Sequence, residues 1–191
     1  LLTMQYPALS LSDGDSFGRS SIEKFGFSDA IQNSDITTVW DGADISGREI
    51  YVYPSSAINV KAVSNDTAND NSTGTGARTI EVQGLDSSYN QITETLTVGG
   101  AASSSQFLRI FRARVATADS KETNAGTISI QEDGTSDTYA QINEVGSSGL
   151  GNGQTFMCVY TVPAGKTAYL SQWAVSTSKS NDTVAFFSVK P

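Results

Sequence analysis

The chain has 191 residues and a mass of 20.2 kDa, which suffices for one substantial hydrophobic core and makes a single domain the expected organisation. Its net charge of −8 disfavours binding to the phosphate backbone of nucleic acids. The sequence contains no His and one Cys, so it lacks groups that most acid–base and nucleophilic catalysis uses, and an enzyme is the least expected class of protein. No apolar stretch approaches the roughly 20 residues that a membrane-spanning helix needs, so no membrane partner is expected.

The first 35 residues differ from the rest of the chain. Aromatic residues are scattered there among Gly and Ser without a sustained period. We interpret residues 1–35 as an extended N-terminal arm whose Phe17, Phe25 and Phe27 need a surface to bury against, either on their own domain or on a neighbour. A single helical turn could form at residues 20–25, although one turn is marginal alone.

From residue 36 onward the chain predicts β-structure, and residues 36–191 are expected to form one domain. Short runs rich in Thr, Val and Ile recur between turn-forming residues, and several of them alternate apolar and polar positions as half-buried strands do. Strands are expected at residues 37–40, 48–53, 58–63, 78–83, 91–98, 107–117, 127–131, 138–144, 154–162, 167–175 and 183–189. Many short strands separated by turn signals predict an all-β fold, an antiparallel β-sandwich of jelly-roll-like form.

The segments between these strands contain strong turn signals. Pro and Gly within residues 163–166 predict a tight turn, and residues 85–90 predict a hairpin connection. Two longer polar stretches, residues 64–76 and 118–126, carry few apolar residues. We expect them to be exposed loops that are available for contacts with a partner.

Candidate chemical groups are few. Cys158 lies in an apolar run and is expected to be a buried, inert thiol. Asp and Asn residues at 13–16 and 65–71 could offer oxygen ligands to Ca²⁺, but they lack the spacing of an EF-hand loop. We interpret them as solvated turn residues, so neither a metal nor a cofactor is expected.

Three arginines cluster in one otherwise apolar run. Alternation places Arg112 and Arg114 on one face of a strand at residues 107–115 and Arg109 on the other. Such a strand fits an edge or a subunit boundary, where guanidinium groups meet carboxylates. We therefore predict that Arg109, Arg112 and Arg114 contribute to a protein interface; the alternative is that they pair with local acidic residues.

A resemblance to a known group of proteins sharpens this interpretation. The segment GARTIEVQGLD at residues 76–86, with YNQITETLT at residues 89–97, resembles a segment that recurs in virion structural proteins of tailed phages, marine and cyanobacterial ones especially. The runs FLRIFR at residues 107–112 and YTVPAGKTAYL at residues 160–170 resemble the same group. These segments are strand and turn patterns without catalytic residues, and together they span about half of the chain.

The resemblance implies a bacteriophage particle component, most plausibly a small decoration or cement protein on the capsid exterior. Proteins of this type bridge capsomers, often as trimers. The implied partner is therefore the major capsid protein, and the implied state is a homo-oligomer, with a trimer favoured. The N-terminal arm with Phe17, Phe25 and Phe27 would supply buried anchors on the shell.

Two other kinds of protein remain open alternatives. A tail, neck or head-fibre component of the same virion would share the composition and the resemblance. A carbohydrate-binding β-sandwich module is conceivable because the chain carries Trp40, Trp173 and seven Tyr residues, although core and interface roles for these aromatics are favoured.

Overall fold

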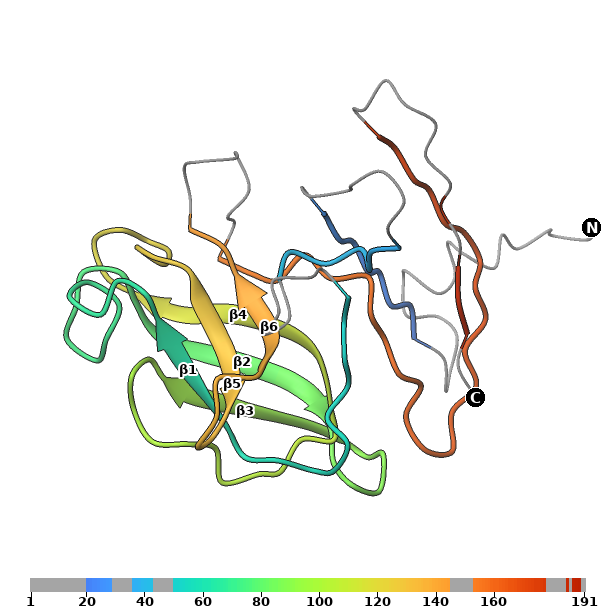
Figure 1. Cartoon of the computed structure of the whole chain (residues 1–191), viewed down its shortest axis with the longest axis horizontal. Coiled ribbons are helices and arrows are strands. Elements are labelled where there is room, and N and C mark those ends of the chain that lie inside the picture. Colours follow the sequence, from blue (N-terminus) through green and yellow to red (C-terminus); the bar gives the residue numbers. More distant parts are fainter. Residues whose placement is uncertain are drawn as a thin grey trace, which may run out of the picture.

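The computed structural model describes residues 20–28, 36–42, 50–144, 153–177, 185 and 187–189. These residues contain six strands and no helix, and the strands form two antiparallel sheets of three strands each (Figure 1). The all-β prediction is confirmed. The helical turn expected at residues 20–25 is wrong: this segment is irregular and lies beside residues 156–158, where Phe27 donates its N–H to the carbonyl of Phe156 (3.3 Å).

The strands are β1 (Val60–Ser64), β2 (Ala77–Leu85), β3 (Gln91–Thr97), β4 (Arg109–Ala118), β5 (Ile128–Glu132) and β6 (Thr138–Ile142). Each of them falls on a strand expected from the sequence. Residues 37–40, 154–162 and 167–175 were also expected to be strands, but they form none. Only isolated bridges occur in the first two, such as Trp40 with Met157. The strand expected at 183–189 lies partly outside the described residues.

The first sheet has the order β1-β5-β6 and the second the order β3-β2-β4. Strands β2 and β3 form one hairpin and β5 and β6 another, so each hairpin is completed by a strand from elsewhere in the chain. Gly84 is required within β2, because a Cβ atom there would lie 2.0 Å from the carbonyl oxygen of Arg109 on β4. The register between β2 and β4 shifts at this point.

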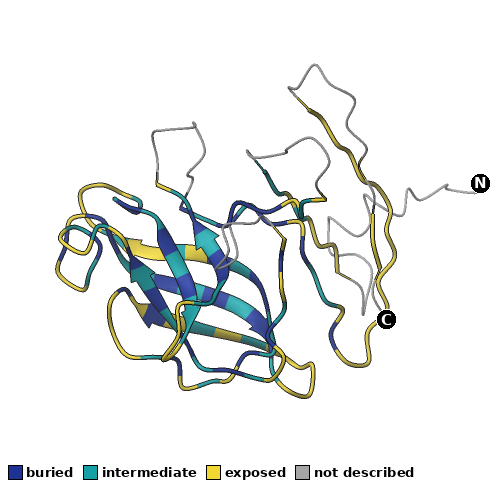
Figure 2. Ribbon diagram, in the orientation of Figure 1, coloured by how far each residue is buried: buried dark blue, intermediate teal, exposed yellow. Residues whose placement is uncertain are grey.

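One hydrophobic core lies between the two sheets, as Figure 2 shows by the buried residues on their facing sides. The alternation in β2 turns Ile80 and Val82 inward, and the same period in β5 turns Ile128 and Ile130 inward. Phe107 joins them from the segment before β4. The period of two therefore predicted the inward residues of these strands correctly.

A buried carboxylate ties together the two long polar loops. Asp70 is 1% exposed, and its carboxylate accepts four hydrogen bonds, from the Ser64 hydroxyl (2.7 Å) and from the backbone N–H groups of Ala77, Ala125 and Gly126 (2.8 Å each). The expectation that these loops are simply exposed is therefore wrong in part, because the sequence gives no sign that one acidic residue turns inward and is fully hydrogen-bonded.

Candidate functional site

The described part of the chain offers no site of metal or membrane chemistry. It contains no group of three or more His, Cys, Asp and Glu side chains placed to hold a metal ion. It also contains no helix that is long and apolar enough to cross a membrane. The features that remain are two hollows, the arginine cluster and the exposed apolar surface.

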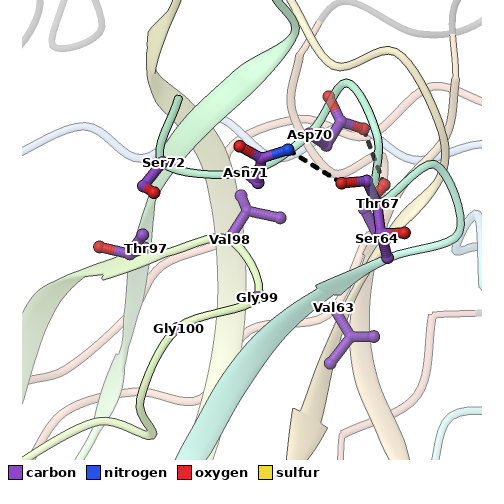
Figure 3. Close-up of a pocket in the computed structure, with 10 residues that line it drawn as sticks. All are labelled: Val63, Ser64, Thr67, Asp70, Asn71, Ser72, Thr97, Val98, Gly99 and Gly100. Atoms are coloured by element: carbon purple, nitrogen blue, oxygen red, sulfur yellow. Dashed lines mark hydrogen bonds between the residues drawn. The ribbon is translucent and has the colours of Figure 1, made fainter. Parts of the chain in front are cut away.

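A hollow of about 330 Å³ lies between the end of β1, the loop that contains Asp70 and the turn after β3 (Figure 3). Its size is at the lower limit of small-molecule pockets. Asp70 is its only charged lining residue, and both oxygens of that carboxylate are engaged by protein donors. The Asn71 amide likewise donates to the Thr67 carbonyl (2.9 Å). The hollow therefore presents no unpaired charged group to a ligand.

Arg109 lies between two tyrosine rings. Its guanidinium carbon is 4.8 Å from the ring centroid of Tyr53 and 5.6 Å from that of Tyr89. One terminal nitrogen donates to the carbonyl oxygens of Leu108 (2.8 Å) and Pro54 (3.4 Å). The side chain thus holds the loop after β2 against residues 53–54 by cation–π contacts and hydrogen bonds.

The other two arginines of the predicted interface also have partners within the chain. Arg114 makes two hydrogen bonds with the Glu81 carboxylate on β2 (2.9 Å each), and this pairing lowers the pKa of Glu81. Arg112 donates to the Gln154 side chain (3.1 Å). The structure therefore does not bring the three arginines together into one surface patch, and a role for them in an interface stays a prediction.

The phenylalanines of the predicted arm are placed in part. Phe17 lies outside the described residues. The Phe25 ring packs on the Phe156 ring (centroids 5.8 Å apart) and is 49% exposed, while Phe27 is half-buried. This part of the expected arm contacts its own domain, and Phe25 keeps an exposed side that a partner could cover.

Lys24 and Cys158 form a small polar group beside this contact. The Lys24 ammonium donates to the carbonyl of Phe111, and burial lowers its pKa to about 8. Cys158 is exposed, so the expectation of a buried thiol is wrong: residues 157–159 alternate, which turns Met157 and Val159 inward and Cys158 outward. Partial desolvation raises the pKa of the Cys158 thiol, which disfavours the reactive thiolate.

Asp41 is a second buried acid. It is 9% exposed, and one carboxylate oxygen accepts the N–H of Phe156 (3.0 Å) while the other has no partner among the described residues. Desolvation raises the pKa of Asp41 to about 6. Its carbonyl accepts hydrogen bonds from Gln141 and Asn143 at the end of β6. This residue joins three segments, and none of its partners among the described residues is a reactive group.

The most distinctive surface is the segment at residues 160–177, which we call the C-terminal limb. It leaves the core, turns at residues 163–166 and runs back beside the domain, and Figure 2 shows it exposed from residue 164 onward. Tyr169 is 88% exposed and Trp173 51% exposed, and Leu170 and Val175 are also exposed. A run of exposed large apolar side chains is typical of a protein–protein contact surface.

A second exposed apolar surface lies on the domain itself, and we call it the flank. It consists of Ile36, Val39, Ile50 and Val52. At residues 50–53 the alternation buries Tyr51, whose hydroxyl donates to the carbonyl of Ile110 (2.9 Å), and leaves Ile50 and Val52 in solvent. The flank and the limb are exposed in the same molecule.

The charge content of residues 153–177 sets the limb apart from the strands expected in the sequence. Residues 153–177 carry one charged side chain, Lys166, in a chain with 32 charged residues. A strand with one solvated face normally carries charges on that face. The near absence of charge in residues 153–177, with aromatics at positions 169 and 173, therefore distinguishes this segment from a half-buried strand.

Comparison with protein-family models finds no match for this chain, and neither curated proteins nor solved structures yield one.

Proposed function

We propose that this chain is a non-enzymatic structural subunit of a virion, a capsid decoration or cement protein that binds the outside of the major capsid protein shell and stabilises it. The observation that carries the proposal is the exposed apolar limb on a β core in which the described residues form no group placed to hold a metal ion. The resemblance of residues 76–112 and 160–170 to virion proteins supplies the kind of assembly.

The geometry supports this role in two ways. Two sheets around one core give a rigid body, and exposed Phe25 and Ile22 beside the core give apolar anchors near the N-terminal arm. On this proposal the arm, residues 1–35, lies on the shell, and Phe17, Phe25 and Phe27 bury there. Repetition of such modest contacts over a symmetric shell multiplies their effect.

The finer fold prediction belongs to the same proposal. Residues 153–155 lie against β4, where Thr155 donates to the carbonyl of Ala113 (2.9 Å) and Val115 donates to that of Gly153 (2.7 Å). This pairing extends the sheet beyond its three regular strands, which supports a jelly-roll-like sandwich. Assembly into a homo-oligomer, with a trimer favoured, would cover sheet edges that otherwise invite aggregation.

A carbohydrate-binding module is a second candidate, favoured by the exposure of Tyr169 and Trp173. Four residues apart on an extended segment, these rings lie about 13 Å apart on the same face. Such a platform could stack on sugar rings. Binding of the purified chain to immobilised glycans, lost in the Trp173→Ala variant, would favour this candidate.

The proposal is tested by locating the chain in purified particles. Its copies are counted against the major capsid protein by quantitative mass spectrometry, and the particle surface is imaged by electron cryomicroscopy. Copies at regular positions over the outer shell support a decoration protein. A small number at one vertex would assign the chain to the neck or tail, and absence from particles would overturn the proposal.

A further inference from the structure

Backbone hydrogen bonds fix the segment from which the C-terminal limb extends. Before the limb, Cys158 donates its N–H to the carbonyl of Val39 (2.8 Å), and at the turn Ala164 donates to the carbonyl of Tyr89 (2.9 Å). These two contacts lie at the two ends of residues 158–164, and the second holds the turn against the loop between β2 and β3. The limb beyond residue 166 therefore has a defined direction, so less conformational entropy is lost when it binds.

The limb can contact a partner through its side chains and through its backbone groups. In an extended segment, Tyr169, Trp173 and Val175 point to the same side, because side chains alternate with a period of two. No backbone–backbone hydrogen bond joins residues 167–175 to another described residue. Toward the described part of the chain, the backbone of residues 167–175 is thus open to pairing with an extended segment of a partner, while the aromatics of the limb pack on that partner's apolar surface.

The distribution of charged residues in the chain indicates which kind of partner binds the limb. Each copy has a net charge of −8, so two copies repel one another unless they meet on neutral surface. Residues 167–177 carry no charged side chain, and neither do residues 50–60, which contain Ile50 and Val52 of the flank. A basic partner would instead gain most by meeting the acidic surface of the chain. Two neutral apolar surfaces on one acidic chain favour contact between copies.

The available area is sufficient for a stable contact. At their exposed fractions, Tyr169 and Trp173 together offer on the order of 300 Å² of aromatic surface. Val175, on the same side, adds to it, so the limb supplies a substantial part of the roughly 800 Å² that each partner contributes to a typical interface. The limb does not cover the flank of its own chain, because Val52 is 57% exposed.

We propose that the limb of one copy binds the flank of a second copy, with Tyr169 and Trp173 packed on Ile50 and Val52. The contact is heterologous: each copy offers a limb to one neighbour and a flank to another. Repetition of such a contact generates a closed ring when the rotation between copies closes. The inference rests on the proposed function only in treating the chain as a subunit of an assembly, and it concerns contact between copies rather than contact with a shell.

The first test is sedimentation velocity of the purified full chain over a range of concentrations, without any shell protein. Wild type is expected to sediment as a species heavier than 20.2 kDa. The Tyr169→Ser/Trp173→Ser variant is expected to associate at least about 100-fold more weakly, since truncation of central aromatic anchors removes most of the binding energy. A matched control, Ala168→Ser/Gln172→Ser on the opposite side of the limb, is expected to associate within a few-fold of wild type.

A mixing test examines the flank. The Ile50→Ser/Val52→Ser variant is expected to be monomeric alone, as is the limb variant. When the two are mixed, the intact limb of one and the intact flank of the other form a heterodimer. Circular dichroism and thermal unfolding of each variant verify that it is folded.

The inference is overturned if wild type stays monomeric at all concentrations, if the limb variant associates as wild type does, or if the mixed variants fail to pair. None of these results bears on shell binding, which is measured separately with particles.

Discussion

Strand β3 and the limb are both extended segments, but of the two only β3 belongs to a described sheet. Strand β3 has seven residues, of which Ile92 and Leu96 are apolar, and it is paired with β2 along its length. Residues 167–175 are richer in apolar side chains, yet they form no strand among the described residues. Hydrophobicity therefore does not decide which segment is incorporated into a sheet of this molecule.

The turns that precede the two segments explain the difference. Asp86 accepts the N–H groups of Ser88 (2.8 Å) and Asn90 (2.9 Å), which closes a hairpin and delivers β3 directly to the free edge of β2. The turn at residues 163–166 leads back toward residues 153–159, which already contact β4 and Trp40. Residues 167–175 pair with no described strand, and in the contact proposed above another molecule takes that place.

The largest expected loss of stability is for a substitution in the folded core rather than in the limb. Asp70→Ala leaves four buried donors without their acceptor, so we expect the free energy of unfolding to fall by about 3 to 5 kcal/mol. Urea denaturation measures it. Asp133→Ala, which removes the surface ion pair with Lys61, is the control and should cost less than about 1 kcal/mol. Equal losses in the two variants would contradict the role assigned to Asp70.

The second prediction concerns the junction where the core meets the root of the limb. The pKa of Asp41 is about 6 in the folded chain and near its ordinary value of 3.8 in the unfolded chain. Between these values the folded state retains a proton that the unfolded state has lost. Stability therefore falls as pH rises from about 4 to 6, by about 2 to 3 kcal/mol, and stays lower above that range.

The variant Asp41→Asn cannot lose a proton, so it should lack this dependence. We expect it to be more stable than wild type at pH 8 and close to wild type near pH 4, as measured by urea denaturation at both pH values. If the difference between the two proteins is the same at both pH values, Asp41 does not titrate as the structure indicates.

A smaller loss of stability is expected on removal of Arg109, which contacts the loop that is hydrogen-bonded to the turn of the limb. Arg109→Ala removes the stacking on Tyr53 and Tyr89 and the hydrogen bonds to residues 54 and 108, and it should cost about 1 to 2 kcal/mol. Arg114→Ala removes an exposed ion pair with Glu81 and should cost under about 1 kcal/mol. Thermal unfolding orders the two. A larger loss for Arg114 would reverse the assignment of which arginine fixes the loops.

The smallest effect is expected in the limb itself. Trp173→Ser should change the unfolding free energy of the isolated monomer by less than about 0.5 kcal/mol, because an exposed side chain contributes little to the core. Phe107→Ala, at a fully buried position, should cost about 3 to 5 kcal/mol under the same dilute conditions. A cost at Trp173 close to that at Phe107 would mean that the limb is packed on its own domain.

The sequence predicted the parts of the fold that depend on local pattern. Alternation in residues 78–83 and 127–131 identified β2 and β5 and their inward residues, and the turn residues at 85–90 identified the hairpin. It could not identify partners that are distant in the chain. Asp70 looked like a solvated loop residue because its donors are contributed by residues up to 56 positions away.

The contacts of the candidate interface residues could not be predicted from the sequence. Arg109, Arg112 and Arg114 have partners within the chain and their role in an interface stays a prediction, while the exposed aromatics of the limb were expected in a strand. A strand within a sheet and an extended segment outside it have the same period of two. What separates them is the availability of an edge, which depends on the whole fold rather than on the segment.

The most direct test of the account is hydrogen–deuterium exchange of the full chain at low and high protein concentration. We predict that amides of β2 are protected equally at both concentrations, because they belong to the core of one molecule. Amides of residues 167–175 should exchange fast when dilute and slowly when concentrated, because a second copy covers them. Fast exchange of these amides at every concentration, or protection that persists on dilution, would contradict the claim that the limb is completed by another molecule.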